Sequence, residues 1–447
     1  MKNLKNLSIF VVILVLASCA KPEDEITANG TDQELATLLS EKSPTNVKDY
    51  FILPNSNDLS AIPQDPNNPL SAAKIALGKL LYHETGLAQN PRFDASKNTY
   101  SCASCHHAAA GFQAGRRQGI SDGAVGFGMI GEARIKHPDC PEDSVDFQPI
   151  RSPSILNIAY QEAILWNGQF GAQGINQNTS AQWTPGTPKA VNTLGYQGTE
   201  IQAIAGFGVH RLGVNDSLFE NTAYKDMFEA AFGKLPPNVL WTTEKIGLAI
   251  AAYERVVLSN QAPFQKWLKG EFSAMSERQK QGAKVFFGKA GCDACHGGPN
   301  LANMEFHALG MNDFDNSQVL GQVDPGTKKG RGGFTKNPED DYKFKVPQLY
   351  NLKDSPFYGH GGSFTSVEDV VRYKNAGVVE NGEVPTGKIS PLHKPLNLTE
   401  DEILALTDFI ENGLYDPNLT RYVPSSLPSN LCFPFADAQA KQDMGCD

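Results

Sequence analysis

The chain has 447 residues, of which 40% are hydrophobic and 20% charged, a composition typical of a globular protein with a hydrophobic core. Acidic side chains outnumber basic ones by 49 to 39, and no run of Lys and Arg stands out beyond the N-terminus, which argues against nucleic-acid binding. The length suggests roughly two or three domains, and the net charge of −10 favours a basic protein partner.

The first residues have the pattern of a secretion signal. Lys2 and Lys5 precede an apolar stretch over 7–16 that is too short to span a bilayer. It ends in the tetrapeptide LASC, which resembles a bacterial lipobox with Cys19 as the acylated residue. We therefore expect residues 1–18 to be a lipoprotein signal peptide and the mature protein to be an exported bacterial lipoprotein, anchored to the membrane by lipid only, in the periplasm or at the cell surface. An ordinary secretory signal is the alternative, and it would also lead out of the cytoplasm.

The remaining elements are mostly helices and long loops. Residues 19–69 are rich in Asn, Asp, Glu, Pro and Ser and are predicted to form a tether and an extended lead-in. Apolar residues then recur at helical spacing, and the predicted helices are 72–82, 155–166, 243–258, 276–287, 367–374 and 399–412. Polar, glycine-rich stretches are predicted to be long loops, at 110–150, 168–198 and 310–342. Few stretches alternate with a period of two, so the fold is predicted to be mostly α.

One pentapeptide, C-x-x-C-H, occurs twice. This spacing is the attachment site of a c-type haem, in which two thiols bond to one porphyrin and the following histidine binds its iron. The residues predicted to hold haem are Cys102, Cys105 and His106 in the first half and Cys292, Cys295 and His296 in the second. A structural zinc ion would need four ligands in paired sets, and a dithiol redox pair would not need the histidine twice. The sequence therefore predicts two covalently bound haem c groups.

The order of helix, haem motif, long loop and further helix appears in both halves. We interpret this as a duplication that gives two cytochrome c-like haem domains in tandem, over 70–262 and 263–447, the second with a C-terminal tail. Of the three cysteines left over, Cys432 and Cys446 could form a disulfide that fixes this tail. Cys140 is then odd, and it is either free or takes the place of one of the pair.

Short segments around the two haem motifs complete a recognisable set. They are 76–82, 102–112, 151–157, 166–169, 200–203, 282–287, 306–310, 344–347 and 360–363. Together they resemble the bacterial diheme cytochrome c peroxidase superfamily over about residues 70–430, including the MauG branch that oxidises tryptophans on a partner protein. The resemblance implies that peroxide binds at the first haem, on His106, and that the second haem, on His296, is six-coordinate and passes electrons. Trp166 matches a family tryptophan between the haems, a relay for electrons; the alternative is an aromatic residue of the core.

Peroxide chemistry also needs a group that moves a proton and a group that stabilises charge. The family supplies a Gln, matched here by Gln202, and a Glu ten residues later, which this chain lacks. His210 and Arg211 stand near that position, and the pair could act as proton shuttle and charge stabiliser. His210 could instead pack structurally or bind the iron. Glu200 is a further acid–base candidate, unless it belongs to the surface of a helix.

Two adjacent residues are candidates for the sixth ligand of the second haem. The family places Met or Tyr at the position of Lys374, which lies beside Tyr373, and both residues are candidates. Met304 and Met311 are fallback ligands. A calcium ion between the domains is common in the family, but Arg151 stands where an Asn ligand is expected, so calcium is left open.

These patterns lead to one functional prediction and two alternatives. The prediction is a diheme c-type cytochrome peroxidase that reduces hydrogen peroxide to water with electrons from a small cytochrome c or copper protein. The first alternative is a MauG-like diheme oxidase that modifies aromatic residues of a partner protein, favoured by Tyr373 as a ligand and by the missing Glu. The second is a non-enzymatic electron-transfer cytochrome, which requires both haems to stay six-coordinate.

Overall fold

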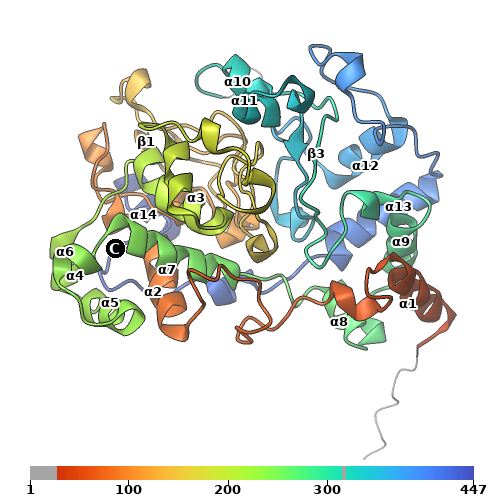
Figure 1. The fold of residues 1–447 in the computed structure, drawn as a ribbon, viewed down its shortest axis with the longest axis horizontal. Coiled ribbons are helices and arrows are strands. Elements are labelled where there is room, and N and C mark those ends of the chain that lie inside the picture. The colour runs from red at the N-terminus through yellow and green to blue at the C-terminus, as the bar shows by residue number, and fades with distance from the viewer. Residues whose placement is uncertain (1–27, 315–318, 447) are drawn as a thin grey trace, which may run out of the picture.

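The computed structural model describes residues 28–314 and 319–446, so the predicted signal peptide and Cys19 lie outside the described residues. Helices dominate this part of the chain, as predicted, and long irregular segments connect them (Figure 1). None of the described helices is long and apolar enough to cross a membrane.

The regular elements are fourteen α-helices and four very short strands, counted over the described residues. The helices are α1 (Gly30–Lys42), α2 (Ala72–His83), α3 (Gly198–Val209), α4 (Asp216–Glu220), α5 (Tyr224–Phe232), α6 (Pro237–Leu240), α7 (Thr243–Arg255), α8 (Pro263–Leu268), α9 (Glu277–Phe287), α10 (Pro325–Lys328), α11 (Arg331–Thr335), α12 (Val367–Ala376), α13 (Glu400–Asp408) and α14 (Ala438–Met444). The strands are β1 (Ala124–Val125), β2 (Ile135–Lys136), β3 (Phe306–His307) and β4 (Phe344–Lys345). β1 pairs with β2 and β3 pairs with β4, both antiparallel.

Two main hydrophobic cores are present, the first built on α2, α3, α5 and α7 and the second on α8, α9, α12 and α13. In both, the helix that leads to a haem motif crosses its neighbour through a glycine. A Cβ on Gly78 of α2 would lie 1.8 Å from the carbonyl oxygen of Ala249 in α7. A Cβ on Gly282 of α9 would lie 2.0 Å from the carbonyl oxygen of Ala405 in α13. Only glycine allows backbones this close, and the same device in both halves is consistent with the predicted duplication into two haem domains, which stays a prediction.

The N-terminal end of the described chain packs on the second core. Helix α1 lies against α9, with Leu35 and Leu39 fully buried, and Trp267 donates a 2.7 Å hydrogen bond to Asp32 (Figure 1). The prediction of a tether over 19–69 is therefore wrong for this stretch. Two apolar residues one turn apart are enough to dock a short helix when a neighbouring core supplies the rest of the apolar surface.

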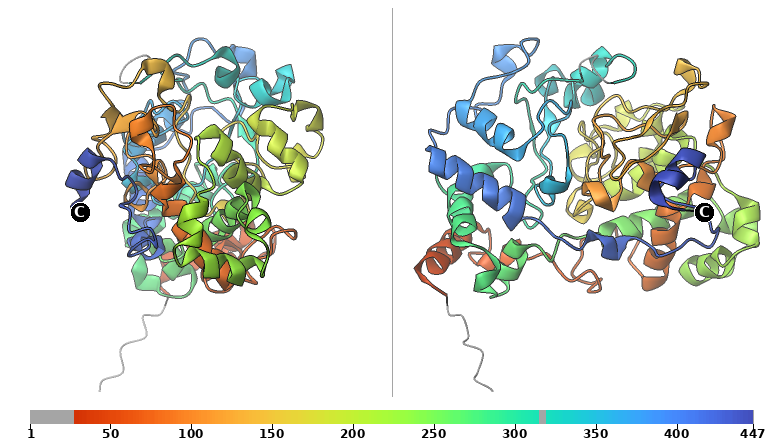
Figure 2. Two further views of the ribbon diagram at one scale, coloured as in Figure 1. Left: turned by 90° about the vertical axis from the view of Figure 1, so that its left-hand side faces the viewer. Right: turned by 180° about the vertical axis from the view of Figure 1, so that it is seen from behind.

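The C-terminal tail crosses in the opposite direction. After α13 the chain returns to the first core, where Tyr422 and Phe435 are buried (Figure 2). Cys432 and Cys446 form the disulfide that the sequence suggested, and Cys140 is a buried free thiol. The tail was grouped with the second half in the sequence, but it packs on the first.

Five of the six predicted helices are confirmed, as α2, α7, α9, α12 and α13. The prediction at 155–166 is wrong, because only the 3-10 turn Ile158–Tyr160 forms there. Asn157 and Leu165 adopt left-handed backbone conformations, with φ of 56° and 73°, which a helix does not allow. Apolar residues of this stretch line a cavity between the two cores instead.

Candidate functional site

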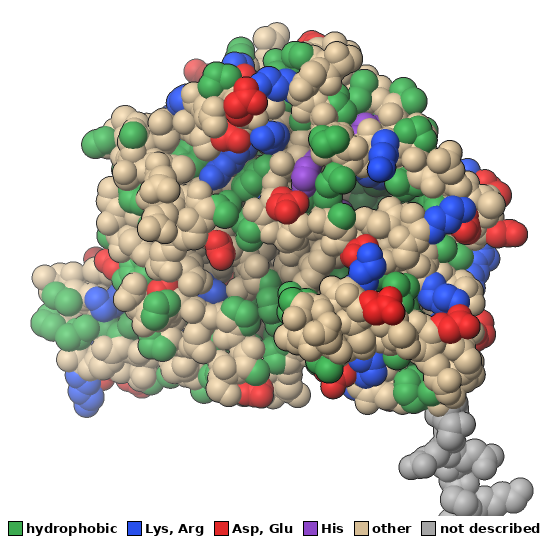
Figure 3. All heavy atoms as spheres, turned by 45° about the vertical axis from the view of Figure 1, so that its right-hand side comes forward, with side chains coloured by type: hydrophobic (Ala, Val, Ile, Leu, Met, Phe, Trp, Pro, Cys, Tyr) green, Lys and Arg blue, Asp and Glu red, His purple; other side chains and the backbone are tan. Residues whose placement is uncertain are grey.

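A cavity of about 890 Å³ lies between the two cores and is lined by residues of both halves. Figure 3 shows a hollow on one face of the molecule, with hydrophobic and His side chains inside it and Lys and Arg side chains near its rim. The histidines of both C-x-x-C-H motifs, His106 and His296, belong to the cavity wall. The fold therefore brings the two motifs, which are far apart in sequence, to one shared space.

The first motif follows α2 in a 3-10 turn, Cys102–Ser104. The buried Tyr82 of α2 donates a 2.6 Å hydrogen bond to the backbone carbonyl of His106 and so fixes this turn. Nδ1 of His106 is buried without a hydrogen-bond partner in the described part of the chain. Burial lowers the pKa of the ring to about 4, so the imidazole is neutral at neutral pH, as a ligand of iron must be.

The second motif follows α9 in an equivalent turn, Cys292–Ala294. Nδ1 of His296 donates a 3.1 Å hydrogen bond to the carbonyl of Leu301, which leaves Nε2 free to bind a metal. Burial lowers the pKa of His296 to about 4 and raises that of the Cys292 thiol to about 12. In each half two free thiols stand before a neutral imidazole, and this donor set fits a covalently held haem.

His210 ends helix α3 and lines the cavity. Its Nδ1 lies 3.0 Å from a carboxylate oxygen of Asp146, and Ser121 donates a 2.5 Å hydrogen bond to the same oxygen. Burial works against both charged forms, but the ion pair nevertheless raises the pKa of His210 and lowers that of Asp146. The charge of His210 also helps to lower the pKa of His106, so the two rings lie near the same space. Because Asp146 accepts the proton of Nδ1, Nε2 of His210 is left as the acceptor.

Gln202 lies about two turns earlier on α3, and its side chain also lines the cavity. Its Oε1 is buried and has no hydrogen-bond partner among the described residues. Leaving a buried acceptor unpaired costs free energy, so this oxygen is suited to receive a hydrogen bond from a bound molecule. Gly206, on the same stretch of wall, has nothing within 4 Å of the place of a Cβ, which leaves room beside Gln202.

Two other residues predicted to act here do not line the cavity. Glu200 is fully buried in an ion pair with Arg255, at 2.5 Å, and is on neither the surface nor the cavity wall. Arg211 has a left-handed backbone, with φ of 56°, and its guanidinium donates a 2.5 Å hydrogen bond to Asp122. The structure therefore argues against Glu200 as an acid–base group and against Arg211 as a charge stabiliser, because both are engaged in structural ion pairs.

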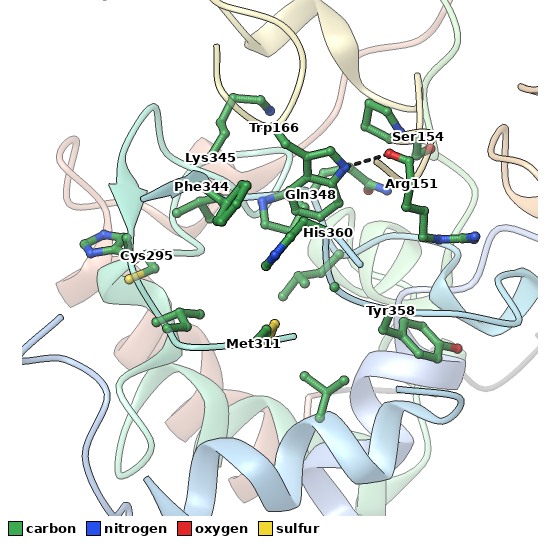
Figure 4. Close-up of a pocket in the computed structure, with 18 of the residues that line it drawn as sticks. Arg151, Ser154, Trp166, Cys295, Met311, Phe344, Lys345, Gln348, Tyr358 and His360 are labelled. Atoms are coloured by element: carbon green, nitrogen blue, oxygen red, sulfur yellow. Dashed lines mark hydrogen bonds between the residues drawn. The ribbon is translucent and has the colours of Figure 1, made fainter. Parts of the chain in front are cut away.

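Trp166 lies in the cavity wall where the two halves meet (Figure 4). Its Nε1 donates a 2.8 Å hydrogen bond to the carbonyl of Arg151, and its own carbonyl accepts one of 2.7 Å from the backbone of Lys345. Its ring stands edge-on to that of His360, with 6.3 Å between centroids. Residues of both halves thus hold Trp166 at their junction, and its role as an electron relay stays a prediction.

The two predicted sixth ligands of the second haem differ in position. Lys374 of α12 lines the cavity, where burial lowers its pKa, and its Nζ lies 3.4 Å from Nδ1 of His393. Tyr373 does not line the cavity, because its hydroxyl points to the carbonyl of Leu309 and donates a 2.5 Å hydrogen bond. Of the two fallback methionines, only Met311 belongs to the wall. The geometry favours Lys374 or Met311 over Tyr373.

Sequence reasoning missed Asp146 altogether. It lies in a glycine-rich loop far from His210 in the chain, and no local pattern connects the two. Calcium binding between the domains stays untested. The position where the family has an Asn ligand holds Arg151, whose cationic side chain is buried. Among the described residues, one group of three potential metal ligands lies together, formed by Cys295, Glu305 and His307. It includes a thiol of the second haem motif and so does not define a separate site.

A mostly helical chain in which two C-x-x-C-H motifs meet at one cavity has the features of the di-haem c-type cytochromes. Residues 72–273 match the family model of the di-haem cytochrome c peroxidases, so this part of the chain is similar to that family. Haem c is the cofactor that this family implies.

Relatives with known names cover most of the chain. Cytochrome-c peroxidase IdrP1 of Denitromonas iodatirespirans is 29% identical over 379 residues, which cover 80% of this chain and 86% of that protein. Methylamine utilization protein MauG of Methylorubrum extorquens is 28% identical over 394 residues, which cover 88% of each. A solved structure of a MauG-like protein associated with microbial copper homeostasis has the same fold, with a TM-score of 0.55 and 22% identity, covering 85% of this chain and 97% of that one.

Proposed function

We propose that this protein is a di-haem peroxidase that reduces hydrogen peroxide to water with electrons from a small redox protein. The observation that carries the proposal is the cavity wall formed by His106, Gln202 and His210, the last of which is hydrogen-bonded to Asp146. It combines a neutral imidazole suited to bind iron, an unpaired acceptor and a histidine held in one tautomer by a carboxylate. The names of related proteins, cytochrome-c peroxidases among them, support the same activity.

We assign one haem to each half. The attachment residues are Cys102, Cys105 and His106 for the first haem and Cys292, Cys295 and His296 for the second. When bound, the first haem supplies the iron that reduces peroxide and the second supplies the iron that passes electrons to it. Lys374 is our preferred sixth ligand in the second half, because it lies in the cavity wall and burial favours its neutral form.

Proton transfer is the task of the protein side chains. Reduction of one peroxide to two waters consumes two electrons and two protons. Nε2 of His210 takes a proton from the bound peroxide and returns it to the departing oxygen. Asp146 keeps Nδ1 protonated and stabilises the imidazolium that forms. Oε1 of Gln202 accepts a hydrogen bond from the peroxide and so orients it.

Electrons come from a small cytochrome c or copper protein and enter through the second half. The net charge of −10 favours a donor with a basic surface. Trp166 bridges the two halves by hydrogen bonds to each and is the aromatic group best placed to relay electrons. A lipid on Cys19 would hold the enzyme at a membrane surface outside the cytoplasm, where such donors are found.

A MauG-like oxidase that modifies a partner protein is the second candidate, since a relative bears that name. The argument for it from the sequence was Tyr373 as an iron ligand. The hydrogen bond from Tyr373 to Leu309 and its absence from the cavity wall weigh against that role, so we prefer peroxide reduction.

Electron paramagnetic resonance of the ferric two-haem protein, before and after one-electron reduction, tests this assignment together with His210→Ala. We expect a high-spin signal in the half-reduced wild-type protein, the same signal in His210→Ala, and a large loss of peroxidase turnover in that variant. His137→Ala, which alters an imidazole outside the cavity wall, is the matched control and should keep full turnover. Low-spin signals alone in both oxidation states, converted to high-spin by His210→Ala, would instead make His210 an iron ligand and the protein an electron carrier.

A further inference from the structure

Each half of the chain contributes one buried cation to the cavity wall. In the first half it is Arg151, which is 1% exposed and precedes Pro153 by two residues. The carbonyl of Pro153 faces the ring of His106, the residue assigned to the first haem. Asn157, four residues after Pro153, then turns the chain with a left-handed backbone conformation, φ 56°.

Lys345 has the same place in the second half. It is 6% exposed and precedes Pro347 by two residues, and the carbonyl of Pro347 faces the ring of His296. Asn351, four residues after Pro347, has the same left-handed backbone conformation, with φ of 56°. Arg151 and Lys345 therefore occupy matching places in the two halves, each in the segment that packs beside a predicted haem-binding histidine.

Neither cation has a carboxylate partner among the described residues. The guanidinium of Arg151 donates to neutral oxygens, including the carbonyl of Arg116 at 2.8 Å and Oγ of Ser355 at 2.9 Å, and its Nε is buried without a partner. The ammonium of Lys345 donates to the amide oxygen of Gln161. Burial lowers the pKa of Arg151 to about 10 and that of Lys345 to about 8, because it disfavours the charged forms.

The cavity as a whole is short of negative charge. Its basic lining residues are Arg151, Lys289, Lys328, Lys345, Lys374 and Lys394, and its acidic lining residue is Asp313. Lys289 and Lys328 form ion pairs with glutamates that do not line the cavity, but Arg151 and Lys345 form none among the described residues. A buried charge without a counter-ion is costly, so this wall calls for anions from outside the chain.

We propose that Arg151 and Lys345 are the counter-ions of the propionate carboxylates of the first and second haem, one buried cation for each cofactor. This proposal depends on the proposed function only in that two haems are bound. Each cation would pair with its propionate by a charge-assisted hydrogen bond. Each would also raise the reduction potential of its own haem, because a fixed positive charge favours the reduced iron, which carries one positive charge fewer.

A redox titration of the purified two-haem protein, followed by the absorption of each haem, tests the proposal. Lys345→Met removes the charge and keeps much of the side chain. We expect the potential of the second haem to fall, with a decrease of roughly tenfold in its ratio of reduced to oxidised form at a fixed potential, the order expected for a unit charge in a partly buried site. The first haem should be unaffected, and Arg151→Met should show the reverse. Lys289→Met, in which the lost cation already had an acidic partner, should shift neither.

Lys345→Arg keeps the charge and should keep the wild-type potentials. An unshifted second haem in Lys345→Met, or an equal fall in Lys345→Arg, would overturn the proposal. If Lys345→Met binds a single haem, recovery of the second haem in Lys345→Arg supports the pairing, and its loss in both variants contradicts it. The titration contains no peroxide, so a protein that shows these shifts but has no peroxidase turnover would contradict the proposed function alone.

Discussion

Replacing Asp146 by Asn tests the proton-transfer role of His210 most sharply. The substitution exchanges a carboxylate that lies 3.0 Å from Nδ1 of His210 for an uncharged amide of the same shape. The Asp146 side chain is 14% exposed and that of His210 is 33% exposed, so water screens the pair in part. The amide can offer its NH₂ group to Nδ1, which would place the proton of His210 on Nε2, the wrong nitrogen for a base. We expect turnover to fall roughly 100-fold, the lower end of what a positioned general base contributes.

The pH dependence gives a second readout of Asp146→Asn. His210 must be neutral to accept a proton, so turnover is lost as the pH falls through its pKa. Asp146 raises that pKa in the native protein. In the variant the acid limb of the turnover profile should therefore move to lower pH while the plateau drops. Steady-state peroxide reduction, measured from acidic to neutral pH with an artificial electron donor, would show both changes.

Asp143→Asn is the matched control, because Asp143 is an exposed carboxylate in the same loop that accepts a hydrogen bond from Ser144, whereas His210 pairs with Asp146. It should leave the plateau and the acid limb unchanged. An acid limb at the wild-type position in Asp146→Asn, or equal profiles for the two variants, would refute the assignment of His210 as the group whose protonation limits turnover.

Three further predictions concern the fold and the junction between the halves. Gly282→Ala would place a methyl group 2.0 Å from a carbonyl oxygen of α13 and should lower the free energy of unfolding by about 1–3 kcal/mol. The control Gly387→Ala, which has nothing within 4 Å of the added methyl group, should change it little. Equal melting temperatures for the two variants would contradict this prediction. Cys446→Ser opens a disulfide with a sequence separation of 14 and should lower the free energy of unfolding, measured with a chemical denaturant, by roughly 3 kcal/mol. An unchanged free energy of unfolding would mean that this disulfide does not stabilise the tail. Trp166→Phe should slow the oxidation of the second haem after peroxide is added, followed by stopped-flow absorption. Trp183→Phe should not, since that indole is hydrogen-bonded within its own loop, and equal rates in the two variants would exclude a relay at Trp166.

The features that the sequence predicted correctly are those that depend on near neighbours in the chain. The C-x-x-C-H spacing of Cys102, Cys105 and His106 is likewise a local pattern, and the haem attachment that it indicates stays a prediction. Helices such as α7 and α9 carry their apolar residues at helical spacing along one continuous segment. The stretch over 155–166 has similar apolar residues, but a left-handed Asn157 breaks it, and no residue pattern distinguished it from a helix.

The features that were missed depend on contacts between distant segments. Asp146 meets His210 only because a long loop folds back over the end of α3. The short α1 is stable because the second core covers Leu35 and Leu39. The correspondence of Arg151 with Lys345 is visible in the sequence as R-S-P and K-V-P, but such short strings carry no weight until both side chains are known to be buried beside equivalent histidines.

The most direct measurement of the central claim is the number of donor electrons that the purified two-haem protein consumes for each hydrogen peroxide. A reduced small cytochrome c with a basic surface, mixed with the protein and a limiting amount of peroxide, is expected to deliver two electrons per peroxide and to stop when the peroxide is exhausted. Donor that stays reduced while peroxide persists, in a protein shown to carry both haems and tested in both the ferric and the half-reduced state, would contradict the account.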